Sequence, residues 1–290
     1  ACGTGSADQL VPGHSSMVHG LLGCNPVEII SPVSTCNSGM GALKYCYMSV
    51  MCGNSKNAAA TGSEKSSTWL LSKNFEEEVK MLQGLQENNY LAFEKDFLRW
   101  MLSDAAGVAL LQNKPNEKSL SLKIKGMRNI SYANELETCM YGGCIKDEKG
   151  NIVPWSDLSP TEYVEKSVFT LKQDIDILSK SIVKYGIRWI KDSLEVFNLR
   201  VDDINYFLPH MSSFFFKEKI FDELYEQGIG IPYEKWFTNL EYVGNTGAAS
   251  SCLMLEELFN SGKLEKGDII FLSVPESARF SYITLYLEVI

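Results

Sequence analysis

The 290-residue sequence predicts an α/β fold, and three observations support that prediction. Short apolar and β-branched runs, typical of buried strands, alternate with longer segments in which apolar residues recur at helical spacing. Hydrophobic residues make up 45% of the chain and charged residues 22%, as in soluble proteins that bury a sizeable core. The order strand, reactive side chain, helix occurs in both halves, which predicts an internally duplicated fold.

The first half contains the elements that surround one cysteine, Cys36. Val27–Ile30 is apolar and β-branched, which predicts a buried strand, and Ala42–Met51 has helical spacing without a helix breaker. Cys36 therefore lies where a strand is followed by a helix. A polar, acidic and aromatic segment, Phe75–Trp100, predicts helices that border a cavity or a partner. The remaining predicted elements are a helix at His14–Leu22, a short strand of small residues at Asn57–Gly62, a buried strand at Ala105–Leu111 and an edge strand at Ser119–Gly126.

The second half begins with a long and strong helical pattern, Thr161–Phe197, which has acidic residues early and Lys191 late, as the helix dipole favours. A predicted buried strand, Asp202–Leu208, then ends on Pro209-His210. Further predicted elements are helices at Phe214–Gln227 and up to Phe259, and strands at Asp268–Val274 and Phe280–Ile290. We expect three parts, namely an N-terminal half (1–127), an inserted lobe (128–160) and a C-terminal half (161–290).

The composition disfavours several functional classes. A net charge of −9 argues against a nucleic-acid surface, which requires a concentrated basic face. Three histidines without paired ligand spacing and eight cysteines without a CxxC pair predict neither a metal site nor a disulfide framework. No apolar stretch is long enough to span a bilayer and no export signal is visible. We therefore expect a cytoplasmic protein that does not act at a membrane.

The strongest chemical candidate is Cys36, within the sequence SPVSTCNSGMGAL. At the start of a helix, unpaired backbone N–H groups and the positive end of the helix dipole face the sulfur and favour the thiolate. Gly39 and Gly41 keep side-chain bulk away from the neighbouring backbone. We interpret Cys36 as an activated nucleophile. The alternative is a small buried apolar residue, which is the commoner role of a lone cysteine.

Two more reactive side chains follow in the second half. His210, in LPHMSS, comes directly after a strand, where open α/β sheets collect reactive side chains. Asn245, in YVGNTGAASS, stands at a predicted helix N-cap with small residues behind it. Taken singly, His210 also fits a core histidine and Asn245 a simple helix cap. Three such residues, each at a junction between a strand and a helix, together favour a catalytic site.

These motifs resemble the active-site motifs of β-ketoacyl-acyl carrier protein synthase III and its relatives in the thiolase superfamily. Gly62-Ser63-Glu64, after a strand of small residues, and Ser103-Asp104-Ala105-Ala106-Gly107, before an apolar strand, add to the resemblance. The resemblance covers nearly the whole chain and implies a thiolase-like five-layered αβαβα fold and a homodimer. The first strand–helix–strand block of the family has no counterpart here, so residues that it gives to the coenzyme A channel are not assigned.

The resemblance also implies an activity, the decarboxylative Claisen condensation. Cys36 would attack an acyl thioester and hold the acyl group, while His210 and Asn245 would donate hydrogen bonds to the thioester carbonyl of a malonyl extender. The backbone N–H groups of Cys36 and Ser277 would form the oxyanion hole for the acyl carbonyl. The substrates would arrive as acyl-CoA or as thioesters of an acyl carrier protein, and no further cofactor is implied.

The sequence departs from the family pattern in two places near this site. Pro275-Glu276-Ser277-Ala278-Arg279 replaces a glycine-rich loop, and Ser277 fits there only if its backbone does not need a positive φ. Met211-Ser212-Ser213 replaces a segment that usually ends in asparagine. HMSS and VPES resemble condensing enzymes of dialkylresorcinol and flexirubin-type pathways, which implies larger acyl or β-ketoacyl substrates. Ser213 and Phe214 are predicted substrate contacts, although three adjacent phenylalanines also fit a simple core.

Three other functions remain open from the sequence. The chain order Cys, His, Asn also occurs in papain-like proteases, although the CGSCW-type signature of that family is absent. A non-catalytic partner subunit of a ketosynthase fits less well, because such subunits generally lose the nucleophile. Acyl transfer to an alcohol or amine, without carbon–carbon bond formation, would use the same Cys36.

Overall fold

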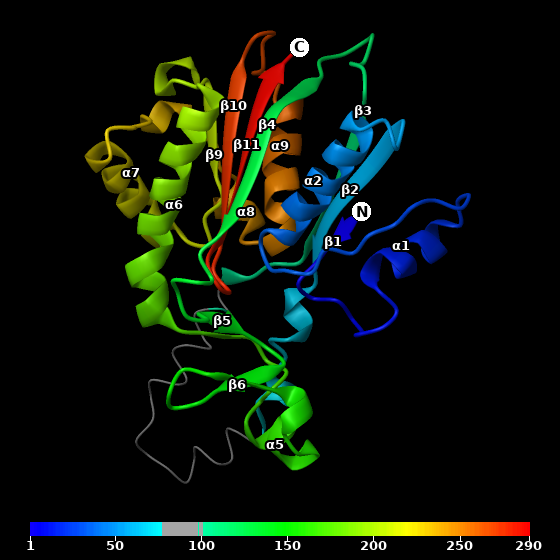
Figure 1. Cartoon of the computed structure of the whole chain (residues 1–290), viewed down its shortest axis with the longest axis vertical. Helices are drawn as coiled ribbons and strands as arrows, with labels where there is room; N and C mark the ends of the chain where they lie inside the picture. Colours follow the sequence, from blue (N-terminus) through cyan, green and yellow to red (C-terminus); the bar gives the residue numbers. More distant parts are fainter. Residues whose placement is uncertain (77–97, 99–100) are drawn as a thin grey trace.

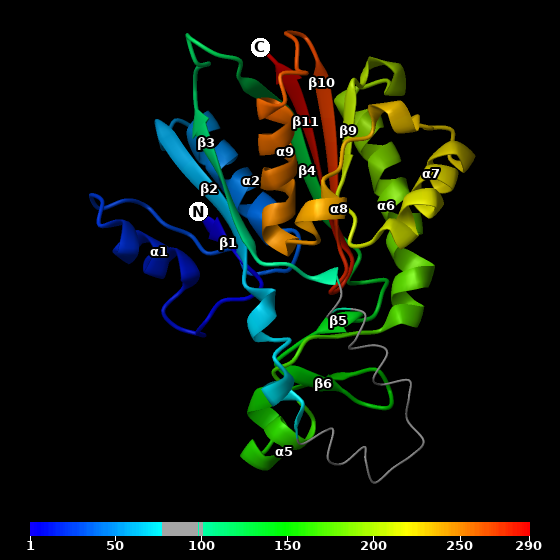
Figure 2. The ribbon, with the colours of Figure 1, turned by 180° about the vertical axis from the view of Figure 1, so that it is seen from behind.

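The computed structural model describes residues 1–76, 98 and 101–290. In this part of the chain, two larger β-sheets have helices between and beside them, and two sheets of two strands each, β5-β8 and β6-β7, lie apart from them (Figure 1). The helices α2 (Ser38–Met51) and α9 (Ser250–Asn260) lie between the sheets, and α6 (Ile175–Phe197) and α7 (Lys217–Glu226) cover the outer face of the C-terminal sheet. These helices and the two sheets form four of the five expected layers. The view from behind shows the same order of layers (Figure 2). The helices predicted within residues 75–100 lie almost wholly outside the described residues.

The two sheets share one pattern of three strands, as the predicted duplication requires. In the N-terminal sheet, β2 pairs in parallel with β1 and antiparallel with β3. In the C-terminal sheet, β10 pairs in parallel with β9 and antiparallel with β11, and β4 adds a fourth strand beside β11. The N-terminal strands are β1 (Cys2–Gly3), β2 (Asn57–Glu64) and β3 (Ala105–Gln112). The C-terminal strands are β4 (Leu122–Ser131), β9 (Tyr206–Pro209), β10 (Ile269–Glu276) and β11 (Ser281–Val289).

The layer between the sheets is held by apolar packing and by one close backbone contact. Met40 of α2, Met254 of α9 and Leu272 of β10 belong to a single buried cluster. A Cβ atom on Gly39 would lie 2.2 Å from the carbonyl oxygen of Ala248, so only glycine lets the start of α2 touch the segment that leads into α9. This contact joins the segments that carry two of the predicted site residues.

Two smaller parts flank the layers. Helix α1 (His14–Leu22) packs against β1, where Ser15 Oγ accepts a hydrogen bond from the Cys2 N–H. A small lobe lies between β4 and α6 in the sequence, and it consists of β5 (Met140–Tyr141), β6 (Cys144–Lys146), β7 (Ile152–Pro154), α5 (Pro160–Glu165) and β8 (Lys172–Gln173). A short helix α8 (Leu240–Val243) precedes the segment into α9. None of the helices in the described ranges is long and apolar enough to cross a membrane.

Two predictions about buried strands are wrong. Val27–Ile30 is not a strand but an exposed, irregular segment, in which Val27 is 55% exposed. The Ile30 carbonyl accepts a hydrogen bond from the Cys2 N–H, so the segment follows the edge of β1 without forming a regular ladder. β3 is a strand as predicted, but its outer face is exposed at Val108 and Leu110, because no described helix covers that face.

Two predicted boundaries also differ from the structure. The helical pattern Thr161–Phe197 is divided into α5 and α6, and Ser167, with a φ of 45°, lies in the chain between them. The expected boundary after residue 127 falls inside β4, which pairs with β11 along its length, so this strand belongs to the C-terminal sheet. The other predicted helices and strands outside 77–100 are present with shifted ends.

Candidate active site

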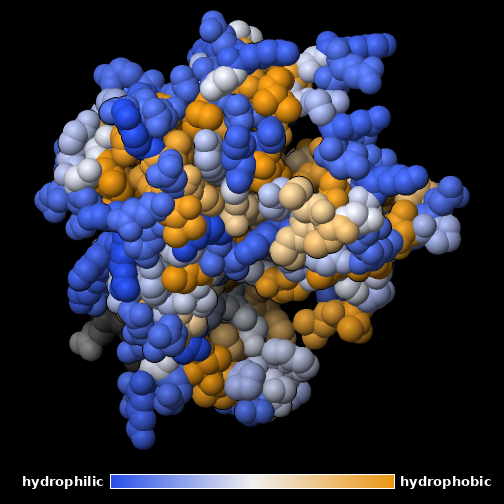
Figure 3. Space-filling model, turned by 45° about the horizontal axis from the view of Figure 1, so that its top comes forward, coloured by the Kyte–Doolittle hydropathy of each residue, from blue (hydrophilic) through white to orange (hydrophobic). Residues whose placement is uncertain are grey.

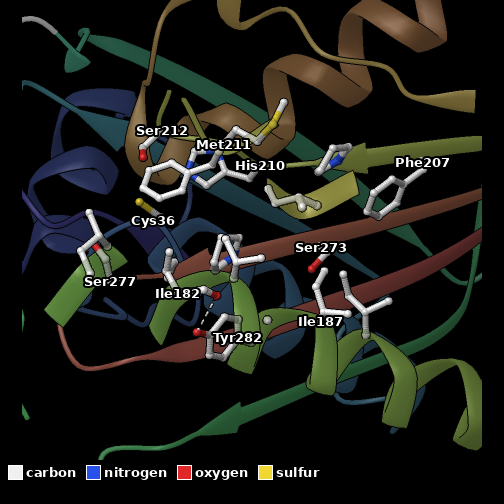
Figure 4. A pocket seen from close by; sticks show the side chains of 18 residues that line it. Cys36, Ile182, Ile187, Phe207, His210, Met211, Ser212, Ser273, Ser277 and Tyr282 are labelled. Atoms are coloured by element: carbon white, nitrogen blue, oxygen red, sulfur yellow. Dashed lines mark hydrogen bonds between the residues drawn. The ribbon is translucent and has the colours of Figure 1, made fainter. Parts of the chain in front are cut away.

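An apolar cavity lies between α6 and the C-terminal sheet, with Cys36 at one end (Figure 4). It encloses about 660 Å³, including space that is open to solvent. Ile182 and Ile187 of α6 line one side, and Phe207 of β9 lies at the end far from the sulfur. The side chains grouped near Cys36 are those of His210, Met211, Ser212 and Ser277. An apolar pocket with a few polar groups at one end is suited to an apolar ligand with one reactive terminus.

Gly186 and Tyr282 also line this cavity, and the sequence patterns did not point to this pair. Gly186 of α6 faces Tyr282 of β11, and a Cβ atom there would lie 3.1 Å from the tyrosine ring. The Tyr282 hydroxyl donates a 3.1 Å hydrogen bond to the Ile182 carbonyl, which fixes the ring beside the helix. A glycine within a strongly helical pattern was the only signal for this pair, since a helix interior otherwise disfavours glycine.

Cys36 lies in a turn that leads directly into α2, as the sequence predicts. The helix begins at Ser38, whose hydroxyl donates a 2.8 Å hydrogen bond to the Thr35 carbonyl and closes the turn around Cys36. The sulfur lines the cavity, and the residue remains partly exposed. Cys36 is thus accessible from the cavity and is not the wholly buried apolar residue of the alternative interpretation.

The prediction that Cys36 favours the thiolate is wrong for this structure. Burial raises the pKa of the Cys36 thiol to about 12, and the nearby carboxylates of Glu276 and Glu64 raise it further through charge repulsion. Hydrogen bonds from the Cys36 backbone and the Thr35 side chain act in the opposite direction but do not compensate. The N-terminal end of a helix is therefore not enough to ionise a thiol that is buried beside two carboxylates. Cys36 is protonated at neutral pH and must lose its proton during attack.

The raised pKa predicts the pH dependence of alkylation at Cys36. Because the thiolate is the reactive form, its alkylation by iodoacetamide should rise about tenfold per pH unit from pH 6 to 9 without levelling off. An ordinary cysteine levels off above its pKa of about 8.5. Quantitative mass spectrometry of the Cys36 peptide measures this rate, with the exposed Cys52 as an internal comparison. A plateau below pH 8 at Cys36 would contradict the assignment of a protonated thiol.

His210 lies directly after β9 and lines the cavity, as the sequence predicts. Its backbone N–H donates a 2.9 Å hydrogen bond to the Ser273 carbonyl, which ties the residue to β10. The side chain is 4% exposed, and burial lowers its pKa to about 4, so the ring is neutral at pH 7. Its Nε2 atom is buried and has no hydrogen-bond partner among the described residues. Such an atom in a cavity wall is available to a ligand.

Asn245 lies in an adjoining loop and is not among the residues that line the cavity. It is buried, its Oδ1 accepts a 3.1 Å hydrogen bond from the Gly247 N–H, and its backbone pairs with Leu102. The predicted role as an N-cap of the following helix is wrong, because the N-cap of α9 is Ala249. The hydrogen bond to Oδ1 orients the amide so that Nδ2 points away from Gly247.

The other predicted site residues divide into two groups. Ser277 lines the cavity beside Cys36. Its φ is not positive, so a serine fits this position without backbone strain, which was the condition for placing Ser277 here. Ser213 and Phe214 do not line the cavity: Ser213 accepts a hydrogen bond from the Phe215 N–H, and Phe214 is 44% exposed. Their neighbours Ser212 and Phe216 take that place instead. The helical turn at residues 214–216 turns only the third phenylalanine inward.

Comparisons with known proteins give a family match and several similar proteins. Residues 194–275, which include His210 and Asn245, match the model of the family described as 3-Oxoacyl-[acyl-carrier-protein (ACP)] synthase III C terminal. A β-ketoacyl-[acyl-carrier-protein] synthase III of Lactobacillus helveticus is 25% identical over 273 residues, which cover 94% of this chain and 72% of the relative. The corresponding protein of Clostridium perfringens strain SM101 is 34% identical over 105 residues, which cover 35% of this chain.

The solved structure of 3-oxoacyl-[acyl-carrier-protein] synthase III from Aquifex aeolicus VF5 has a TM-score of 0.68 and 19% identity. It matches 99% of this chain and 75% of its own length, and it shows that the fold is thiolase-like. The match to the Clostridium relative spans only 31% of that relative's length. The C-terminal family match, the similarity to the Lactobacillus protein over 94% of this chain and the shared fold show that the chain is similar to β-ketoacyl-[acyl-carrier-protein] synthase III and has a thiolase-like fold.

Proposed function

We propose that the chain is a β-ketoacyl synthase, which joins an acyl group on Cys36 to a malonyl or β-ketoacyl thioester with loss of carbon dioxide. One observation carries this proposal: Cys36 and neutral His210, whose Nε2 has no hydrogen-bond partner among the described residues, lie at the same end of an apolar cavity. The similarity to β-ketoacyl-[acyl-carrier-protein] synthase III supports the same reaction class. Acyl-CoA and an acyl carrier protein are the proposed substrate carriers.

In the loading step, the Cys36 sulfur attacks the acyl carbonyl of a thioester. The thiol proton passes to His210 Nε2, and the ring then gives its Nδ1 proton through water to the departing thiolate of the carrier. The step releases a carrier thiol and leaves His210 as the Nε2–H tautomer that the condensation step requires. The negative charge on the acyl oxygen would be stabilised by the backbone N–H groups of Cys36 and Ser277. The apolar side chains of the cavity would hold the acyl chain away from water.

In the condensation step, the extender loses carbon dioxide and leaves an enolate. The Nε2–H of neutral His210 and the Nδ2–H of Asn245 would donate hydrogen bonds to the enolate oxygen as its charge develops. The enolate carbon attacks the carbonyl of the acyl-Cys36 thioester, and the sulfur leaves and is protonated again. A neutral histidine suits this role because its N–H group donates a hydrogen bond without bringing a net charge into the cavity.

The size of the cavity supports the finer proposal of larger acyl groups, as the dialkylresorcinol-type resemblance implies. The surface supports a homodimer, because apolar side chains between residues 10 and 33 are exposed. They include Leu10, Val11, Leu21, Leu22, Val27 and Val33. Apolar patches also interrupt the hydrophilic surface on the face that Figure 3 draws. We propose that this surface is covered by a second copy of the chain in the cytoplasm.

The alternative function is acyl transfer from Cys36 to an alcohol or amine. One observation favours it: Asn245, the second proposed donor for the enolate, does not line the cavity in the structure. Loading would be unchanged in that case, but a malonyl thioester would not lose carbon dioxide.

A two-stage experiment tests the proposed function. The intact protein is first incubated with a series of acyl-CoA thioesters of increasing chain length, and mass spectrometry is expected to show one added acyl group. The acylated protein then receives carboxyl-labelled malonyl thioester of acyl carrier protein. Release of labelled carbon dioxide together with a β-ketoacyl product supports condensation. Loading without such release, followed by transfer to an added alcohol or amine, would establish the alternative.

A further inference from the structure

Glu276 is a buried carboxylate at the end of β10, and it contacts residues that are far apart in the sequence. It is 5% exposed. Its Oε1 accepts hydrogen bonds from Thr35 Oγ1 at 2.7 Å and from the Ala278 N–H at 3.2 Å. Thr35 directly precedes Cys36, whereas Ala278 lies in the turn after β10. One oxygen atom therefore links the turn of the nucleophile to the turn between β10 and β11.

The second carboxylate oxygen extends this link to the other side of Cys36. Glu276 Oε2 accepts a 3.0 Å hydrogen bond from Ser281 Oγ, which in turn accepts a 3.0 Å hydrogen bond from Asn37 Nδ2. The two residues that flank Cys36 are thus both tied to Glu276, one directly and one through Ser281. All of these donors are neutral, and the structure records no salt bridge to Glu276 in the described part of the chain.

The direction of the side chain excludes a direct role in proton transfer to a substrate. Successive residues of a strand point to opposite faces of a sheet. Ser273 and Pro275 line the cavity, and so does Ser277 after the strand, whereas Glu276 does not. Glu276 points instead toward the start of α2, where it meets Thr35. It can therefore act on the reaction only through the groups that it holds.

We propose that Glu276 is a positioning residue that sets the separation between the backbone N–H groups of Cys36 and Ser277. These two groups come from different halves of the duplicated fold, and the Glu276 carboxylate bonds to residues adjacent to each of them. The proposal rests on the proposed function of the two N–H groups as the oxyanion hole. A displacement of about 1 Å between such groups costs up to about 10²-fold in rate.

The Glu276 carboxylate is buried among neutral donors, with no ion pair to a cation in the part of the chain that the structure describes. Burial of a charge is costly unless hydrogen bonds compensate, so these three hydrogen bonds are what keeps the carboxylate in place. The negative charge also disfavours the thiolate of Cys36. Glu276 thus has two separable effects, since its charge slows any attack by sulfur while its hydrogen bonds favour only an attack that forms an oxyanion.

The two effects can be separated with two reagents and four proteins. p-Nitrophenyl hexanoate acylates Cys36 through an oxyanion, whereas iodoacetamide alkylates it without one. We expect Glu276→Leu to lower the acylation rate by about 10- to 100-fold, because the hydrogen bonds that join the Thr35 and Ala278 segments are lost. The same variant should alkylate no more slowly than the unchanged protein, and up to about tenfold faster, because a repelling charge is removed. Glu276→Gln keeps the acceptor for Thr35 and should retain most of the acylation rate.

Glu64→Gln is the matched control for charge. Glu64 also lies near Cys36 and raises its pKa, but its hydrogen bonds go to the Gly5 and Ala248 N–H groups and to Ser6 Oγ. This variant removes a charge near Cys36 and leaves the hydrogen bonds of Glu276 in place, so its rate of acylation should not fall. Thermal unfolding and circular dichroism of each variant show whether it is folded. A destabilised Glu276→Leu protein is replaced by Thr35→Val, which removes the direct hydrogen bond to Glu276 and also the hydrogen bond of the Thr35 side chain to Cys36. Its acylation rate is therefore compared with its own alkylation rate, and the positioning role predicts the larger loss in acylation.

The outcomes separate this proposal from the proposed function. Equal losses of acylation and alkylation in Glu276→Leu, or no loss of acylation, would overturn the positioning role. The positioning role would also be overturned if the unchanged protein is alkylated by iodoacetamide at Cys36 but is not acylated there by p-nitrophenyl hexanoate. A third outcome is that the ester acylates Cys36, that Glu276→Leu lowers this rate as expected, and that no acyl-CoA loads the protein. This outcome supports the positioning role and overturns only the proposed substrate class.

Discussion

Replacement of Cys36 by alanine is expected to abolish formation of the acyl-enzyme. Cys36 is the only cysteine among the described residues that line the cavity, and a thiol is intrinsically a stronger nucleophile than the serine hydroxyls that also line it. Loss of a covalent nucleophile should lower turnover by about 10⁴-fold or more. Intact-protein mass spectrometry after incubation with an acyl-CoA should show no added mass, whereas the unchanged protein gains one acyl group. Thermal unfolding should remain similar, since Cys36→Ala leaves a partly exposed position.

Cys52→Ala is the matched control for this experiment, because Cys52 is exposed and lies at the far end of the same helix. It should load as the unchanged protein does. Retention of a stoichiometric acyl group by Cys36→Ala would place the nucleophile elsewhere and remove the basis of the proposed mechanism.

Replacement of His210 by alanine is expected to separate loading from condensation. The variant should still accept an acyl group, although more slowly, because the Cys36 thiol then loses its proton to solvent. Decarboxylation of the malonyl thioester should fall by about 10²- to 10³-fold, the usual cost of losing one donor to a developing oxyanion. Single-turnover measurements with pre-acylated protein isolate the second step. Asn245→Ala should show the same loss of decarboxylation without slower loading.

His210→Gln tests whether the lost group is a hydrogen-bond donor. Glutamine supplies an N–H group in a side chain of comparable reach, so it should recover part of the decarboxylation rate that alanine loses. Because burial lowers the pKa of His210 to about 4, the ring stays neutral between pH 6 and 8. Titration of His210 should therefore not change the rate of decarboxylation in this range. A loss of loading in His210→Ala with intact decarboxylation would reverse the assigned roles.

Local patterns predicted the elements that carry the site. Helical spacing after Cys36 and the apolar strand before His210 both have their signal within about ten neighbouring residues, and both elements are present. Asn245 was placed at a helix cap from the same type of signal, but the chain makes a further turn at residues 247–249 before α9 begins. A pattern of small residues indicates that another segment packs closely against this part of the chain. It does not indicate at which residue the helix starts.

Interactions between distant residues could not be predicted from the sequence. The hydrogen bond between Thr35 and Glu276 joins residues 241 positions apart, so no local pattern includes both. The same distance in sequence hides part of the reason why Cys36 is protonated: burial raises its pKa most, and the charge of Glu276, from the other half of the fold, raises it further. Among three adjacent phenylalanines, only the backbone geometry decides that Phe216 and not Phe214 reaches the cavity.

The protonated state of Cys36 also has a consequence for chemical durability. Peroxides oxidise thiolates far faster than thiols, and the susceptible cysteines of proteins are accessible and have a low pKa. A nucleophile whose pKa is raised to about 12 and whose sulfur faces an apolar cavity is therefore a poor target for conversion to sulfenic acid. The burial and the neighbouring charges that slow its attack on a substrate therefore also slow its oxidation between turnovers.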